Sequence, residues 1–326
     1  MIRRLKLYRS AGFDPHRNLA VEQHLLETVE EGCCILYLWQ NRNTVVLGRN
    51  QNAWKECRTT ELQKDGGHLA RRLSGGGAVF HDLGNLNFTF LVHSADYDLD
   101  RQLSVVQEAC RALGVETERS GRNDILAGGR KFSGNAFFHN RGRSYHHGTL
   151  LVDADMDALG RYLRPSAAKL RAKGVDSVRA RVVNLRTLQP SVTVDALRIQ
   201  LEAAFAKVYG LEVEPIADSE LDEAAIDALT RRNRSWEWLY GLPLPCDFTC
   251  EDRFPWGELR LELQVESGIV RRAAVYTDAM DWSLAEKLET ALTGSRFTLA
   301  ELCRRAAACD LPERQDVIGL LKRQDI

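Results

Sequence analysis

The sequence has no long apolar run and almost no net charge, and both absences exclude classes of protein. No uninterrupted hydrophobic stretch approaches the roughly 18 residues that suggest a membrane span. The formal net charge is −1, from 44 Lys and Arg against 45 Asp and Glu. An even balance gives no general electrostatic reason to bind nucleic acid or an anionic membrane. We therefore expect a globular protein with neither nucleic acid nor a membrane as its partner.

Cysteine is also scarce, and its distribution argues against a disulfide framework. The eight cysteines lie mostly inside apolar patterns, as reduced core residues do. Cys246 and Cys250 have a loose metal-ligand spacing, but no second pair and no histidine lies near them, which disfavours zinc. The basic N-terminus is not followed by an apolar segment, so no secretory signal is expected. We expect a cytoplasmic protein, or a mitochondrial one if its source is eukaryotic.

What is present fits an ordinary two-domain globular protein. The chain has 326 residues, of which 44% are hydrophobic and 27% charged, proportions that exclude collagen-like, low-complexity and mainly disordered proteins. The length is enough for two domains or for one large domain with an appendage. All eight histidines and 18 of the 24 glycines fall within the first 174 residues. We therefore expect the functional site in the N-terminal part.

Hydrophobic periodicity in the N-terminal part predicts strands and helices that do not alternate regularly. Residues 35–39 and 44–47 are β-rich runs, and the short polar segment between them suggests a hairpin. A helix is expected from Asn18. Two further helices, at 103–113 and 193–209, are each followed by a glycine suited to a helix end. This order disfavours a doubly wound parallel sheet and favours an α+β domain with a mixed or antiparallel sheet.

The C-terminal part has the pattern of a small separate α+β domain. Three prolines punctuate residues 241–257, which we interpret as a linker. Strict alternation over 259–265, a Ser-Gly turn and a second strand over 269–277 predict a hairpin. Two helices are then expected, each opened by a capping box, one beginning at Ser283 and one at Thr298.

Glycine and charge are densest at residues 71–82, which read Arg-Arg-Leu-Ser-Gly-Gly-Gly-Ala-Val-Phe-His-Asp. Three successive glycines weaken a strand, but their N–H groups can approach and bind an anion such as phosphate. Arg72 adds a planar donor fork for phosphate or carboxylate oxygens. A bulged hairpin with surface arginines explains the same residues without a ligand. The sequence has neither a P-loop nor a dinucleotide-binding glycine pattern that opens a helix, so a nucleotide would bind in another way.

Two further stretches carry polar groups of functional interest. Residues 130–136 read Arg-Lys-Phe-Ser-Gly-Asn-Ala, and small residues beside Lys131 would let its ammonium reach a bound ligand. A single lysine is more often a solvated surface group. Residues 145–152 read Tyr-His-His-Gly-Thr-Leu-Leu-Val, a strand whose alternation directs His147 and Thr149 to one face. A hydrogen-bonded core histidine is the simpler explanation of His147 taken alone.

Together, the three stretches are similar to the lipoate–protein ligase A family. The shared patterns are the whole 71–82 block, Lys-x-Ser-Gly-x-Ala at 131–136 and His-His-Gly-Thr-Leu-Leu at 146–151. Segment 50–57 and the Ser-Trp-Glu-Trp at 235–238 also match. The resemblance runs nearly end to end and includes the C-terminal part, as in the long form of that family. The connection between Ile125 and Arg130 is shorter than in some relatives.

The resemblance implies both a fold and a reaction. Residues 1–245 would form a catalytic domain shared with biotin–protein ligases and akin to class II aminoacyl-tRNA synthetases, a mixed sheet with helices. Residues 251–326 would form a small α+β accessory domain. ATP and lipoate would give lipoyl-AMP and pyrophosphate, and a lysine of an acceptor protein would then displace AMP. The implied acceptors are lipoyl domains of 2-oxoacid dehydrogenase acyltransferase subunits and the glycine-cleavage H protein.

The resemblance also implies the site residues, with Lys131 as the catalytic group. The adenylate would be bound by Arg72, Gly75, Gly76, Gly77, Ala78, Val79, Phe80, Asn123, Asp124 and Lys131. The lipoyl group would be bound by Arg72, Ser74, His81, Lys131 and His147. Magnesium is expected on the ATP phosphates, with Asp124 as a candidate ligand. An apolar slot for the acyl tail is expected near Val46, Leu47 and Leu73.

Four other functions compete with that of a lipoate–protein ligase. Transferases of related fold carry the acyl group on a cysteine, but no cysteine lies in or beside the three stretches, the nearest being Cys57 and Cys110. A lipoyltransferase that uses preformed lipoyl-AMP would keep the same adenylate site. A non-catalytic lipoate-binding module is the alternative outside the enzymes. Biotin ligases share the fold but favour different phosphate-loop residues.

Overall fold

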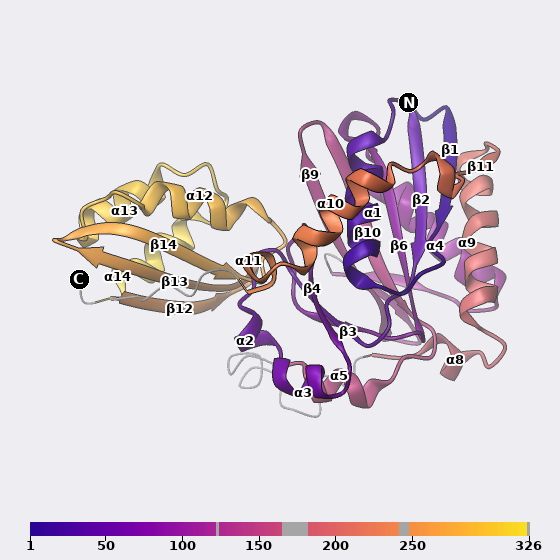
Figure 1. The fold of residues 1–326 in the computed structure, drawn as a ribbon, viewed down its shortest axis with the longest axis horizontal. Coiled ribbons are helices and arrows are strands. Elements are labelled where there is room, and N and C mark those ends of the chain that lie inside the picture. Colours follow the sequence, from indigo (N-terminus) through magenta and orange to yellow (C-terminus); the bar gives the residue numbers. More distant parts are fainter. Residues whose placement is uncertain (122–123, 165–181, 241–247, 325–326) are drawn as a thin grey trace.

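The computed structural model describes residues 1–121, 124–164, 182–240 and 248–324. It comprises a larger unit that carries the N-terminus and a smaller unit built from the C-terminal strands and helices (Figure 1). Among the described residues, no helix combines the length and apolarity needed to cross a bilayer. The boundary predicted at residues 245–251 falls partly on residues outside the described ranges and stays a prediction.

The larger unit is organised around a mixed eight-stranded sheet. In spatial order its strands are β11 (Val213–Pro215), β1 (Arg4–Arg9), β2 (Cys33–Trp39), β6 (Asn85–His93), β10 (Arg143–Leu151), β9 (Arg130–Asn140), β8 (Asp124–Ala127) and β7 (Glu118–Ser120). The first three are parallel to one another, and every later pair is antiparallel. The expected mixed sheet of an α+β domain is confirmed.

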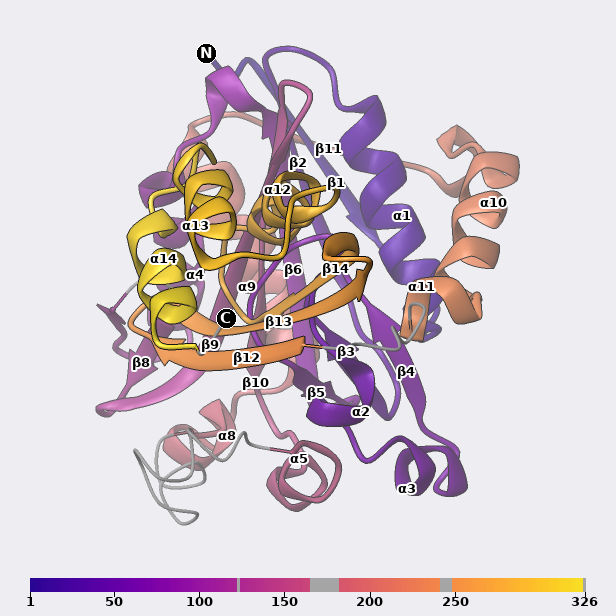
Figure 2. The same cartoon turned by 90° about the vertical axis from the view of Figure 1, so that its left-hand side faces the viewer.

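Helices cover both faces of this sheet (Figure 2). One face packs against α4 (Leu99–Ala112) and α9 (Val194–Tyr209), and the other against α1 (Pro15–Thr28) and α10 (Glu223–Arg234). All seven residues of β2 are buried, because a central strand covered on both sides has no solvent face. The helix expected from Asn18 begins earlier, at Pro15, after the N-cap Asp14. The other two helices are confirmed, and Gly210 ends α9 in the left-handed conformation.

A second, three-stranded sheet lies beside the first, in the order β4 (His68–Arg71), β3 (Thr44–Leu47) and β5 (Val79–His81). Its strands overturn the predicted hairpin between 35–39 and 44–47. Strand β2 already pairs with β1 and β6 on its two edges, so β3 cannot join it and instead pairs with β4 and β5. The short helices of this region are α2 (Ala53–Glu56), α3 (Thr59–Lys64), α5 (Met156–Tyr162), α8 (Leu185–Leu188) and α11 (Trp236–Tyr240).

The C-terminal unit has an antiparallel sheet with three helices against it. Its elements are β12 (Phe248–Phe254), β13 (Gly257–Glu266), β14 (Ile269–Thr277), α12 (Ser283–Leu292), α13 (Leu299–Ala307) and α14 (Arg314–Lys322). Its hydrophobic core consists of residues from this part of the chain alone. The small α+β architecture is confirmed, with one more strand and one more helix than the sequence suggested.

Two local predictions in this unit are wrong. Residues 248–254, assigned to a linker, form edge strand β12, whose Cys250 packs into the core. Pro255 marks the turn between β12 and β13, not a domain linker. The predicted cap at Ser283 also fails, because Ser283 lies inside the helix and bonds to Asp281. The cap at Thr298 is confirmed, since its hydroxyl accepts from the N–H of Glu301.

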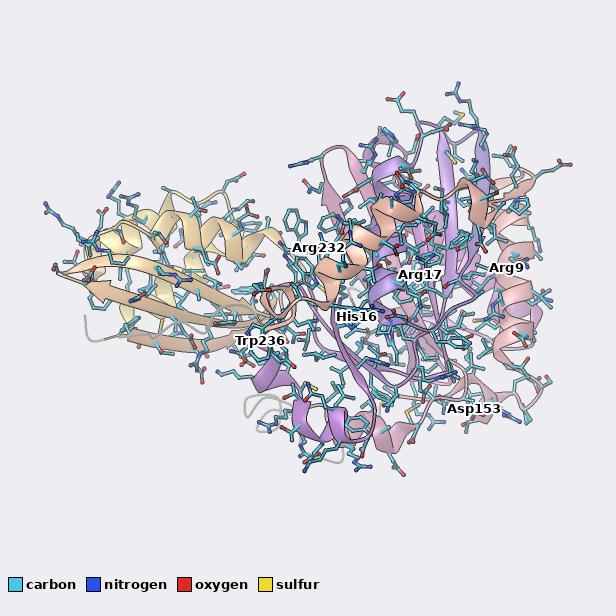
Figure 3. The ribbon with its side chains drawn as sticks, viewed as in Figure 1. Arg9, His16, Arg17, Asp153, Arg232 and Trp236 are labelled. Carbon is cyan, nitrogen blue, oxygen red and sulfur yellow. The ribbon has the colours of Figure 1, made fainter. Side chains whose placement is uncertain are left out.

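The two units meet at the end of β14 and the loop that follows it. The Ala279 carbonyl accepts from Gly76 N at 2.9 Å, and Asn50 O accepts from Thr277 N at 2.9 Å. The side chain of Asn50 donates to Trp282 O at 2.8 Å. Arg232 and Trp236 lie near this junction in Figure 3. The C-terminal unit is therefore seated directly on the glycine-rich segment.

Candidate functional site

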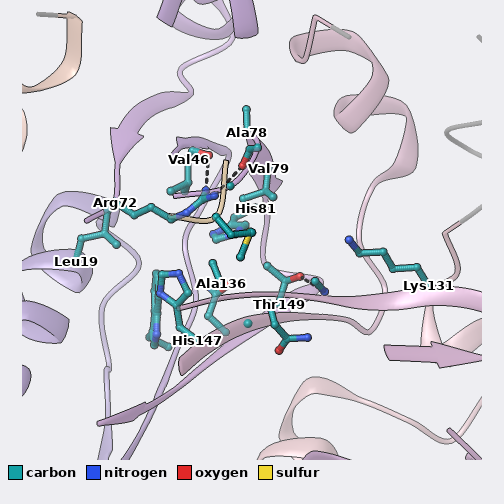
Figure 4. A pocket seen from close by; sticks show the side chains of 18 residues that line it. Leu19, Val46, Arg72, Ala78, Val79, His81, Lys131, Ala136, His147 and Thr149 are labelled. Atoms are coloured by element: carbon teal, nitrogen blue, oxygen red, sulfur yellow. Dashed lines mark hydrogen bonds between the residues drawn. The ribbon is translucent and has the colours of Figure 1, made fainter. Parts of the chain in front are cut away.

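A cavity lies where the small sheet, strands β9 and β10 and helix α1 meet the C-terminal loop (Figure 4). Its empty volume, which includes its open mouth, is about 730 Å³. Its lining consists of Leu19, Trp39, Val46, Arg72, Gly76, Gly77, Ala78, Val79, His81, Asn87, Lys131, Gly134, Asn135, Ala136, His147, Gly148, Thr149 and Met280.

The cavity brings together residues from all three sequence stretches. Eight of the residues expected to bind ligand line it: Arg72, Gly76, Gly77, Ala78, Val79, His81, Lys131 and His147. Gly75, Phe80, Ser74 and Asp124 are not part of the lining. The remaining candidate, Asn123, lies outside the described residues.

Of the residues expected for the apolar slot, Val46 lines the cavity. Leu47 does not, because neighbours on a strand face opposite ways, and it packs with Val45 in a separate core. Leu73 is not in the lining either and packs against the core beneath α1.

Two of the three successive glycines, Gly75 and Gly76, occupy positions that a side chain would disturb. A Cβ on Gly75 would lie 2.3 Å from the Ala279 carbonyl oxygen, and Gly76 has a φ of +87°. A Cβ on Gly48, across the loop, would lie 2.1 Å from Gly76 O. The segment is also not a hairpin, since β4 and β5 each pair with β3 and not with each other. The bulged-hairpin alternative is therefore wrong.

Arg72 is a buried structural element of this loop, 6% exposed. Its Nη2 donates to Gly75 O at 2.7 Å and to Gly77 O at 2.8 Å, and its Nη1 to Val46 O at 3.2 Å. Burial lowers its pKa to about 10, which leaves it charged at neutral pH. The guanidinium of Arg72 therefore holds the carbonyl groups of the glycine loop in place, and part of the same side chain also lines the cavity.

Arg71 forms hydrogen bonds to other partners, among them Trp238 of the Trp-Glu-Trp segment that resembles the ligase family. Its Nε donates to Trp238 O at 2.8 Å, while the Trp238 indole donates back to Arg71 O at 3.0 Å. Its Nη1 donates to the carbonyls of Gly48, Arg49 and Gln51. Neither arginine of the pair is a surface group, because both are more than nine-tenths buried.

A hydrogen-bonded chain links helix α1 to the glycine loop through His147. Ser74 Oγ lies 2.9 Å from His147 Nε2, and His147 Nδ1 lies 2.8 Å from Glu22 Oε1. Glu22 also accepts from Thr89 at 2.7 Å. In the neutral ring, Nδ1 donates to the carboxylate and Nε2 accepts from Ser74, whose oxygen accepts from Arg72 Nε at 3.1 Å.

The order Ser–His–acid resembles a hydrolase triad, but the burial does not fit one. Ser74 is fully buried and is not in the cavity lining, so no substrate carbonyl reaches it. The chain therefore orients His147 and Arg72. Glu22 was missed from the sequence, although a carboxylate three residues after Leu19 and four before Leu26, on the buried side of a helix, was a usable signal.

We expect Glu22→Ala to destabilise the fold by about 1–3 kcal/mol, because Thr89 and His147 would lose a buried acceptor. Denaturant unfolding measures this change in the free energy of unfolding. Glu27→Ala is the matched control, since Glu27 lies on the exposed side of the same helix. Equal stability of the two variants would contradict the role given to Glu22.

Lys131 lies to one side of the other labelled residues of the cavity (Figure 4). Its side chain is 34% exposed, against 9% for His147. The ammonium forms an ion pair with Asp124 at 2.6 Å. A Cβ on Gly134 would lie 2.9 Å from Lys131 Nζ, so glycine leaves room for the ammonium beside the strand. Lys131 thus supplies a positive charge near the mouth.

The lining also identifies residues that the sequence patterns did not single out. Trp39, Asn87 and Met280 come from β2, β6 and the C-terminal loop. Of the cysteines in the described part of the chain, none lines the cavity. Cys250 is buried in the C-terminal core, and Cys246 lies outside the described residues. No group of three or more His, Cys, Asp or Glu among the described residues could hold a metal ion.

Comparison with protein families assigns both units. Residues 14–206 match the lipoyl protein ligase A/B catalytic domain, and residues 244–321 match the bacterial lipoate protein ligase C-terminus. The chain belongs to the lipoate–protein ligase family. It is the long form, in which the C-terminal domain follows the catalytic domain on the same chain.

Solved structures of lipoate–protein ligases match nearly all of this chain or about three quarters of it. LipL1 of P. falciparum, determined in complex with lipoate, is 26% identical with a TM-score of 0.87, over 98% of this chain and 100% of that one. A lipoate-protein ligase A bound with ATP is 29% identical with a TM-score of 0.63, over 74% of this chain and all of that one. The bipartite ligase of Thermoplasma acidophilum, studied with its E2 lipoyl domain, is 29% identical with a TM-score of 0.65, over 76% and 100%.

Proposed function

We propose that this chain is an ATP-dependent lipoate–protein ligase that performs both half-reactions. The observation that carries the proposal is the single cavity that unites the glycine loop, Lys131 and the buried His147. The lipoate carboxylate attacks the α-phosphorus of ATP, and the bond to pyrophosphate breaks. The amine of an acceptor lysine then attacks the lipoyl carbonyl, loses a proton and releases AMP.

Lys131 is the catalytic residue in this scheme. A carboxylate is a poor electrophile, and its mixed anhydride with AMP supplies a good leaving group. Both steps build negative charge on phosphoryl or carbonyl oxygens, and a fixed ammonium near the cavity mouth stabilises that charge. The ion pair with Asp124 at 2.6 Å keeps the ammonium at the cavity in the absence of ligand.

The substrates occupy the cavity in a defined direction. The adenylate binds along Arg72 and residues 75–80, with Asn123, Asp124 and Lys131. The lipoyl group binds near Arg72, His81, Lys131 and His147, and Ser74 acts on it through its hydrogen bond to His147. The greater exposure of Lys131 supports a reacting carboxyl group near the mouth. The buried side chains Leu19, Trp39 and Val46 support an inner apolar end for the tail.

ATP and lipoate as substrates are supported by the two related ligases with those ligands bound. Magnesium would neutralise the ATP phosphates. The described residues offer no complete metal cage, which fits an ion held mainly by phosphates and water with one carboxylate, that of Asp124.

Lipoyl domains of 2-oxoacid dehydrogenase acyltransferase subunits are the proposed acceptors. The structural analysis of the T. acidophilum ligase also covered its E2 lipoyl domain, which supports this class. The glycine-cleavage H protein is a second proposed acceptor, because the reaction needs nothing more than an exposed lysine on a domain that the enzyme recognises.

Lipoate-dependent exchange of labelled pyrophosphate into ATP tests the function. A ligase gives exchange that requires lipoate. A lipoyltransferase that needs preformed lipoyl-AMP, or a non-catalytic lipoate-binding module, gives none. The absence of cysteine from the described lining supports direct transfer from the adenylate over a cysteine-bound acyl intermediate.

We also expect the C-terminal domain to move as a unit between the two half-reactions. The adenylate must be shielded from water while it forms, yet the acceptor lysine must later reach its carbonyl. In the structure, the Gly76 N–H donates a hydrogen bond to the carbonyl of Ala279, in the loop after β14. Met280 of the same loop belongs to the cavity lining. A phosphate at the glycine loop would displace that contact.

Small-angle scattering of the protein alone and with a non-hydrolysable lipoyl-adenylate analogue checks this prediction. We expect a changed radius of gyration on binding, because modest interfaces between domains permit relative motion. Superimposable curves at saturating analogue would show that the domain stays in place.

A further inference from the structure

Two nitrogen donors in the cavity wall have no hydrogen-bond partner among the described residues. They are His81 Nε2 and Asn87 Nδ2, and both side chains belong to the lining. His81 is 3% exposed and Asn87 is 1% exposed, so bulk water does not reach them. Buried donors without partners are uncommon, because each one loses its hydration and gains nothing. A ligand in the cavity is therefore expected to pair with them.

The hydrogen on His81 Nε2 is fixed by a chain of oriented amides. Asn18 Nδ2 donates to Asn41 Oδ1 at 3.0 Å, and Asn18 Oδ1 accepts from Ser10 at 2.7 Å. The amide nitrogen of Asn41 must then face His81, whose Nδ1 lies 3.2 Å away and accepts. Burial and nearby Arg72 and His147 lower the pKa of His81 to about 3. The neutral ring thus carries its one hydrogen on Nε2.

Asn87 lies at the same part of the cavity. Its Oδ1 accepts from Asn85 at 2.9 Å, which leaves its amide nitrogen unpaired. In the sheet, Asn87 stands opposite Trp39, and the Trp39 ring lies 6.1 Å from that of His81. Trp39 is buried and lines the cavity. Both donors therefore lie beside Trp39, one of the buried apolar residues assigned to the inner end of the cavity.

We propose that this inner end selects an acyl tail with hydrogen-bond acceptors, the dithiolane sulfurs of lipoate, over the plain alkyl tail of octanoate. His81 and Asn87 are the specificity-determining donors, and Asn41 is a positioning residue that holds the His81 hydrogen on Nε2. The inference rests on the proposed function, because it assumes an acyl tail in this cavity.

The selectivity arises mainly because binding of the octanoyl tail carries a free-energy cost. An alkyl chain displaces any water from the inner end and leaves both N–H groups unpaired. A sulfur is a weak acceptor, yet even a weak hydrogen bond removes part of that penalty. The same apolar wall would bind either chain through its methylenes, so the difference between the tails arises at the donors.

Calorimetric titration with non-hydrolysable lipoyl- and octanoyl-adenylate analogues tests the proposal. His81→Phe keeps a ring and removes the donor, and we expect the lipoyl-over-octanoyl affinity ratio to fall about tenfold. His139→Phe is the control, since His139 lies outside the lining. An unchanged affinity ratio in His81→Phe overturns the proposal. That result is expected if the His81 N–H already interacts with the face of the Trp39 ring and not with the acyl tail. Failure of the unsubstituted protein to bind either analogue would instead refute the proposed function.

Nitrogen-15 spectra of the histidine rings test the same proposal without a His81 variant. We expect a proton on His81 Nε2 and none on Nδ1, and a downfield shift of the Nε2 proton with the lipoyl but not the octanoyl analogue. Asn41→Asp should place a proton on Nδ1, because a carboxylate there can only accept. A proton on Nδ1 in the unsubstituted protein, or equal shifts with both analogues, overturns the proposal.

Discussion

Lys131→Ala should slow both adenylate formation and transfer by about 10²–10³-fold, the loss typical of removing one group that stabilises developing negative charge. The side chain is one-third exposed, and its ammonium pairs with Asp124 alone among the described carboxylates. Its removal should therefore leave the fold intact. Pyrophosphate exchange and single-turnover transfer from preformed lipoyl-AMP measure the two steps separately.

Lys207→Ala is the matched control for this substitution. Lys207 also forms an ion pair, with Glu108, but it lies on the surface of α9 and outside the cavity. We expect wild-type rates from it. Near-normal lipoylation by a folded Lys131→Ala protein would remove Lys131 from the catalytic role.

Gly76→Val should abolish measurable adenylate binding, with an affinity loss of about 10–100-fold from each phosphate hydrogen bond prevented. A Cβ there would lie 2.9 Å from Arg72 Nη2 and 3.3 Å from Met280 Sδ. The substitution would thus disturb the arginine that shapes the loop and the contact with the C-terminal unit. The positive φ of +87° adds strain for a branched residue, so stability should also fall by about 1–3 kcal/mol.

Gly142→Val separates strain from binding. Gly142 has a similar φ of +75°, has no atom within 4 Å of a Cβ and lies in the turn between β9 and β10. We expect a comparable loss of stability and unchanged affinity for the lipoyl-adenylate analogue in calorimetry. If Gly76→Val binds the analogue as tightly as Gly142→Val does, the glycine loop does not hold the phosphate.

Hydrophobic periodicity in the sequence predicted helices well where each helix packs against the core with a single apolar face. Helices α4 and α9 carry one apolar stripe each, with a glycine after the last turn, and both were predicted. The pairing of strands was not predictable in the same way. Strands β2 and β3 are neighbours in sequence, yet each finds its partners elsewhere, because pairing depends on distant segments.

In the functional site, too, residues within one sequence motif were predicted, whereas contacts between distant segments were not. The glycine loop, Lys131 and His147 stand in local patterns and were predicted. Glu22 lies far from His147 in sequence, so their hydrogen bond could not be inferred from either segment alone. The roles of Trp39, Asn87 and Met280 likewise depend on how three separate elements meet.

Residues 248–254 of the C-terminal unit were wrongly assigned to a linker, and the error has a physical reason. The prolines near residue 250 are typical of linkers, but an edge strand tolerates a proline at its ends because one side needs no ladder hydrogen bonds. Strand β12 pairs along one edge with β13 and buries Cys250. Composition alone does not distinguish these two environments.

The most direct test of the account is lipoylation of an isolated lipoyl domain by this chain alone, followed by intact-mass and peptide analysis of the acceptor. We predict one lipoyl group on one lysine, formed from free lipoate and dependent on ATP. Modification from synthetic lipoyl-AMP, with none from lipoate and ATP, would contradict the central claim and identify a lipoyltransferase.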